Sequence, residues 1–181
     1  MKRIWVIILL ASAVRGADVT LLMTGQTMVP NLVRMAATDQ ATRMFAGIGV
    51  RVESKKHNLQ SRSEGIVIQV RFINDTPGHP GAMAFSNPFD PVPVVTVLYD
   101  QFLFATERNR ERRAALLAHV LVHEIGHLLT RTDGHSPEGV MKAHWSNADL
   151  TRMAYRPLPF LPSDVDMILR GLALSSATLS R

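Results

Sequence analysis

Cysteine is absent from the 181-residue sequence, and aromatic residues make up only 6% of it. Without cysteine the chain can form no disulfide bridge, no thiolate-ligated metal site and no thiol nucleophile. Any metal ligand must therefore be histidine, aspartate or glutamate. No block of basic residues with interleaved aromatics is present either, so nucleic acid is not an expected partner.

The N-terminus combines a basic start with an apolar run. Lys2 and Arg3 lead into the apolar run Ile4–Val14, and small residues follow up to Gly16. This run is too short to span a bilayer, and the order is typical of a signal peptide. We therefore expect residues 1–16 to be removed, and a secreted or periplasmic protein without stable membrane insertion that starts near Ala17. This removal lowers the formal net charge from +5 to +2, because three basic residues and no acidic residue are lost.

Residues 17–181 are predicted to form one globular domain, since 46% hydrophobic and 19% charged residues are typical of a protein with a real core. The segment Pro93–Tyr99 is predicted as a strand, and the prolines beside it favour a position at the edge of the sheet. The long segment Asn74–Pro91 is predicted as a loop. Periodicity and capping residues predict strands at Asp18–Met23, Gly49–Ser54, Gly65–Phe72 and Pro93–Tyr99, and helices at 30–47, 100–106, 114–129, 147–154 and 163–174, the last capped by Ser163.

The predicted helix at 114–129 contains the run His123-Glu124-Ile125-Gly126-His127, which has the pattern H-E-x-x-H. Residues four apart lie on one face of a helix, so the two imidazoles can bind one zinc ion while Glu124 faces the open coordination position. Apolar residues lie on the opposite face, where they can pack. The run therefore predicts a zinc hydrolase with Glu124 as general base.

Residues 114–145 resemble the metzincins, zinc peptidases in which the helix motif is followed by a third histidine ligand and a methionine turn. His123, Glu124 and His127 match that motif, and Gly139-Val140-Met141 resembles the methionine turn. The resemblance implies an α+β, metzincin-like zincin fold. Its N-terminal mixed α/β subdomain would contain the active-site helix and reach about residue 129, and a small, mostly helical C-terminal subdomain would begin at about residue 130.

The third ligand departs from the family pattern. Asp133 stands where the family has its third histidine, and His135 follows two residues later. Gly134 adopts left-handed backbone conformations freely, and imidazole suits zinc well, so His135 is preferred as the ligand. Asp133 remains the alternative, and His144 is near enough to be a fallback.

The sequence thus predicts an exported, monomeric zinc endopeptidase that acts on peptide or protein substrates. Zn²⁺ held by His123, His127 and His135 would activate a water, and Glu124 would accept its proton. The resemblance implies a substrate strand that runs antiparallel to the edge strand near Val94–Leu98. Two alternatives stay open, namely a zinc-containing module that binds a peptide or partner without cleaving it, and a zinc amidase that acts on cell-wall peptide.

Overall fold

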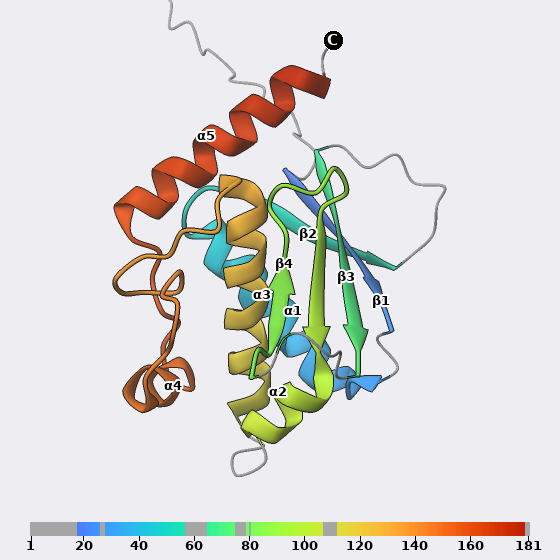
Figure 1. Ribbon diagram of the computed structural model, residues 1–181, viewed down its shortest axis with the longest axis vertical. Coiled ribbons are helices and arrows are strands. Elements are labelled where there is room, and N and C mark those ends of the chain that lie inside the picture. The colour runs from blue at the N-terminus through green and yellow to red at the C-terminus, as the bar shows by residue number, and fades with distance from the viewer. Residues whose placement is uncertain are drawn as a thin grey trace, which may run out of the picture.

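The computed structural model describes residues 18–25, 28–56, 65–74, 79, 81–106 and 112–179 (Figure 1). The predicted signal peptide at 1–16 lies outside these residues. Among the described residues, no helix combines the length and apolarity that crossing a bilayer requires.

A mixed five-stranded sheet forms one layer of the fold. The strands are β1 (Val19–Thr24), β2 (Val52–Lys56), β3 (Ile66–Ile73), β4 (Ala84–Ser86) and β5 (Val94–Leu98), in the order β2-β1-β3-β5-β4. The pairs β2-β1, β1-β3 and β3-β5 are parallel, and only β4 is antiparallel to its neighbour. The alternation in β3 buries Ile68, Val70 and Phe72, while Gln69 and Arg71 are exposed on the other face.

Two long helices pack against the sheet. Helix α1 (Asn31–Ala46) contacts β2, helix α3 (Arg113–Thr130) contacts β4 and β5, and the two helices contact each other (Figure 1). Helix α3 is buried along nearly its whole length, from Leu116 to Leu129. This burial explains why it is apolar even beside its histidines, and it makes α3 a rigid element on which to place a site.

Three shorter or later helices complete the chain. Helix α2 (Tyr99–Thr106) follows β5 directly, α4 (Asn147–Met153) carries a capping box made by Ser146 and Asp149, and α5 (Pro162–Leu179) packs against α3. The expected cap of α5 at Ser163 is wrong, because the helix already begins at Pro162. There the Leu161 backbone N–H donates to the Asp164 carboxylate at 2.9 Å.

The predicted edge position of the strand at 93–99 is also wrong. β5 lies between β3 and β4, and the two edges of the sheet are formed by β4, on this side, and β2 on the other. Pro91 and Pro93 precede the ladder and do not interrupt it, and the Pro93 carbonyl accepts from the Gln69 backbone N–H at 3.0 Å. The edge strand therefore comes from the segment that was predicted to be entirely loop.

Gly171 sets how closely α5 crosses α3. A Cβ at this position would collide with the carbonyl oxygen of Leu129. Replacing Gly171 with alanine should therefore push α5 away from the end of α3, and overpacking of this kind costs about 1–3 kcal/mol. We expect the melting temperature of Gly171→Ala to fall by several degrees. The exposed neighbour Arg170→Ala is the control, and equal melting temperatures for the two variants would contradict the close crossing.

Candidate metal centre

Helix α3 brings three of the predicted residues to one cleft. His123 and Glu124 are adjacent and His127 lies one turn further along, and His123 and His127 are only 9% and 6% exposed. The Nε2 atoms of the two histidines are 3.0 Å apart. Two ligands of a tetrahedral zinc ion, each about 2.0–2.1 Å from it, lie roughly 3.3 Å apart, so the helix spacing suits one shared ion.

Backbone carbonyls fix the orientation of both rings. The Nδ1 of His123 is 2.9 Å from the Val140 carbonyl oxygen, and the Nδ1 of His127 is 2.8 Å from the Thr132 carbonyl oxygen. Since a carbonyl only accepts, each Nδ1 carries a proton, and each Nε2 keeps its lone pair toward the other ring. This second hydrogen bond is the usual way in which proteins orient metal-binding histidines.

Burial keeps the two rings neutral. It lowers the pKa of His123 to about 4, against the opposing effect of the hydrogen bond to Val140. It also lowers the pKa of His127 below its usual value. Both imidazoles are therefore neutral at neutral pH, with one proton on Nδ1 and a lone pair on Nε2, which is the form that binds a metal ion.

His135 joins these two residues from the segment that follows α3. The ligand atoms of His123, His127 and His135 all lie within 4.8 Å of one another, and they form the only group of three metal-binding side chains among the described residues. Asp133 is exposed and is not part of the group. Three imidazole nitrogens with an exposed third ligand fit Zn²⁺, which favours such a donor set and leaves a fourth position to water or substrate.

The chain reverses in a different way from that expected. Arg131, not Gly134, takes the left-handed conformation at the end of α3, with φ 53°, and Gly134 is not among the positive-φ residues. Gly134 was expected at the reversal because a Cβ at positive φ costs about 1–2 kcal/mol. This cost alone did not decide which residue takes the left-handed conformation. The bond from His127 to the Thr132 carbonyl stabilises this turn.

Met141 forms the floor beneath α3, as the methionine turn predicts. A Cβ at Gly126 would overlap the Met141 sulfur, so the glycine inside the H-E-x-x-H run lets this side chain lie directly under the helix. Gly139, with φ +78°, turns the chain so that the Val140 N–H donates to the Pro159 carbonyl at 2.9 Å. The same residue, Val140, orients His123 through its own carbonyl.

Glu124 lies in the cleft beside the three histidines. Burial raises its pKa to about 7, although hydrogen bonds from Ser86 oppose this effect. The Ser86 hydroxyl is 2.7 Å from Oε2 of Glu124. A carboxyl group with a pKa near neutrality is suited to accept and return a proton, and a nearby divalent cation would favour its ionised form.

The cleft has a volume of about 570 Å³ and runs between β4 and the segment after Met141. The Trp145 ring packs edge-on against His123, with ring centroids 5.5 Å apart, and its buried indole N–H has no acceptor among the described residues. The walls comprise Gly81, Ala82, Met83, Ala84, Val120, Lys142, Ala143, His144 and Trp145, with His123, Glu124 and His135 at the base.

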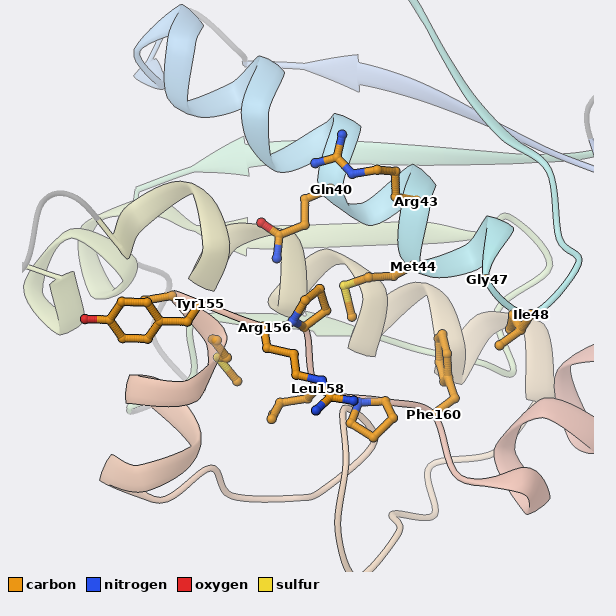
Figure 2. A pocket seen from close by; sticks show the side chains of 13 residues that line it. Gln40, Arg43, Met44, Gly47, Ile48, Tyr155, Arg156, Leu158 and Phe160 are labelled. Carbon is orange, nitrogen blue, oxygen red and sulfur yellow. The ribbon is translucent and has the colours of Figure 1, made fainter.

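Other histidines and tyrosines lie apart from the three-histidine cluster. His119 is fully buried and bonded at both nitrogens, to the Ala115 carbonyl and from the Leu158 backbone N–H, which makes it a structural residue. His144 lines the cleft but does not belong to the cluster. Tyr155 lines a separate hollow of about 680 Å³ between the end of α1 and residues 153–160, where Figure 2 shows Gln40, Met44 and Arg156 around the opening. That hollow contains none of the predicted site residues.

Sequence reasoning missed Ser86 and Trp145. Ser86 lies in a three-residue strand within a segment rich in proline and glycine, where no periodicity marks it. Trp145 lies in a stretch with little periodicity. Only the tertiary structure brings either residue to the cleft.

Among solved structures, the fold is similar to that of archaemetzincin from Methanopyrus kandleri. The TM-score is 0.58 at 16% sequence identity, and the match covers 87% of this chain and 96% of that chain. No protein-family model and no curated protein matches the sequence. The likeness supports the expected fold over most of the chain, whereas the boundary between two subdomains near residue 130 stays a prediction.

Proposed function

We propose that this protein is an exported zinc-dependent peptidase. The observation that carries the proposal is the convergence of three imidazoles and the carboxyl group of Glu124 at one cleft beside an edge strand. The likeness in fold to archaemetzincin supports it. His123, His127 and His135 would hold the ion, as the sequence predicts.

A zinc ion held by His123, His127 and His135 would supply an acidified water and a Lewis acid for the carbonyl to be cleaved. Glu124 accepts the proton of the attacking water and passes it to the leaving amine. His123 and His127 keep their orientation through the Val140 and Thr132 carbonyls. Burial of these groups strengthens the electrostatic interactions within the cleft.

Strand β4 is suited to bind the backbone of a substrate. The Met83 carbonyl accepts from the Leu98 N–H at 2.9 Å, and Phe85 pairs with Thr96, so the backbone groups of these two residues face β5. Because successive residues of a strand alternate, the N–H and C=O of Ala84 point away from β5. An extended peptide could pair with this open edge in the cleft. We propose this position in place of β5.

The test is a zinc measurement combined with a peptide-library screen. Purified protein should bind about one zinc ion and cleave peptides in a reaction that a chelator stops and added zinc restores. If the protein binds one zinc ion but shows no chelator-sensitive cleavage, the peptidase proposal is wrong and the alternative of a non-proteolytic binding module is favoured. Cleavage confined to cell-wall peptides would instead favour the amidase alternative.

Export is proposed from the N-terminal sequence alone. The basic start, the apolar run Ile4–Val14 and the small residues before Ala17 are those of a signal peptide. We expect the protein outside the cytoplasm to begin at or near Ala17. Intact-mass analysis checks this, and exported protein that retains Met1 would contradict it.

A further inference from the structure

Strand β4 and helix α3 are connected by Ser86, the last residue of the strand. Its hydroxyl oxygen is 2.7 Å from Oε2 of Glu124 and 3.2 Å from the backbone carbonyl oxygen of Glu124. A hydroxyl has one proton to donate, and the carboxylate oxygen is both the nearer and the stronger acceptor. Ser86 therefore binds one particular oxygen of the glutamate side chain.

Ser86 restricts the orientation of the Glu124 carboxyl group. Within the part of the chain that the structure describes, Ser86 is the only residue that hydrogen-bonds the Glu124 carboxyl group, through its hydroxyl and also through its backbone N–H. A glutamate side chain has three rotatable bonds, and a bond to one oxygen restricts them. The Ser86 hydroxyl thus fixes the carboxyl group of Glu124 in the cleft that His123 and His135 also line.

We propose that Ser86 is a positioning residue, which holds Glu124 so that one carboxylate oxygen faces the attacking water. The proposal rests on the proposed hydrolytic function. Strand β4 would then have two roles. The backbone of Ala84 would pair with the substrate, and Ser86, two residues later, would orient the general base. The register of Ser86 with Val95 fixes both positions on the sheet. A substrate paired with β4 would thus be placed relative to Glu124 by a single short strand.

Misplacing a general base lowers the rate of the chemical step more than it lowers binding. We expect Ser86→Ala to reduce kcat about 10- to 100-fold and to change KM less than about threefold. Ser86→Thr keeps the hydroxyl and should restore most of kcat. The matched control is Ser175→Ala in α5. It removes a hydroxyl that donates to the Gly171 carbonyl and does not line the cleft, so kcat should stay unchanged.

A second measurement does not depend on turnover. A peptide hydroxamate binds zinc and places its hydroxyl proton on the glutamate, so its affinity reports where that carboxylate lies. Calorimetry on the zinc-loaded proteins should show hydroxamate binding weakened about tenfold by Ser86→Ala and restored by Ser86→Thr. Zinc affinity and melting temperature should stay close to those of the unchanged protein.

The outcomes separate this proposal from the proposed function. A zinc protein that cleaves no peptide, but loses hydroxamate affinity in Ser86→Ala, would remove the peptidase function and keep the positioning role. Wild-type hydroxamate affinity and kcat in Ser86→Ala would overturn the positioning role alone. So would a joint loss of zinc affinity, melting temperature and activity that threonine does not restore, because Ser86 would then only stabilise the packing of β4 on α3.

Discussion

Glu124→Gln is expected to leave zinc binding and folding nearly intact and to lower the rate of hydrolysis by about 10²- to 10⁴-fold, the usual contribution of a general base. Glutamine has almost the shape of glutamate and can still accept the Ser86 hydrogen bond through its amide oxygen. It cannot take a proton from water. The measurement is kcat/KM on a peptide from the library screen, with zinc content determined on the same sample.

The same variant should change the stability of the metal-free protein in a direction that the pKa fixes. The pKa of Glu124 rises from 4.5 to about 7 on folding, so between these pH values the folded state binds more protons than the unfolded state. Stability therefore falls as pH rises from about 4.5 to about 7, and the loss persists above pH 7. Glutamine does not ionise, so metal-free Glu124→Gln should melt higher than the metal-free original at pH 8, and this advantage should vanish near pH 4.

Full hydrolytic activity in Glu124→Gln would exclude Glu124 as the base. Loss of zinc together with activity would mean that the carboxylate supports the metal site instead of the proton transfer. Glu138→Gln, at an exposed position outside the cleft, serves as the control for removal of a carboxylate and should leave both zinc and activity unchanged.

Local sequence was sufficient for the helix that carries the site. His123 and His127 share one face because they are four residues apart, and apolar residues cover the opposite face of α3, so both features can be predicted from spacing alone. The predicted strands at Asp18–Met23, Gly65–Phe72 and Pro93–Tyr99 correspond to β1, β3 and β5, because each alternates or forms an apolar run. The strand predicted at Gly49–Ser54 overlaps β2 only in part, because β2 runs from Val52 to Lys56.

Features that depend on distant partners could not be predicted in this way. β4 has three residues, and it becomes a strand only because it pairs with β5, so nothing in its own sequence distinguishes it from a loop. The edge of the sheet was therefore assigned to the wrong strand. Ser86 reaches Glu124 across 38 positions of sequence, and its serine is typical of any turn. Arg131 adopts a conformation that its residue type disfavours, because bonds around it compensate.

The largest effect on the metal is expected from His135→Ala. Its ligand atom lies within 4.8 Å of those of His123 and His127, and no other described side chain completes a group of three with them. Two histidines and solvent hold zinc far more weakly than three histidines do. We expect zinc affinity to fall by several orders of magnitude, measured by competition with a chelator of known affinity. Asp133→Ala removes the neighbouring alternative and is the matched comparison.

Asp133 acts on the site only through its charge. It is exposed and lies near enough to His127 to raise the pKa of that ring slightly, against the larger effect of burial. Loss of an outer partner that is hydrogen-bonded to a ligand typically weakens metal binding about 10- to 100-fold, so Asp133→Ala should weaken zinc binding by at most this factor. Since zinc that binds only the folded state stabilises it, excess zinc should raise the melting temperature of Asp133→Ala and hardly change that of His135→Ala. A larger loss of zinc affinity in Asp133→Ala than in His135→Ala would transfer the third ligand to Asp133, the position at which metzincins have their histidine.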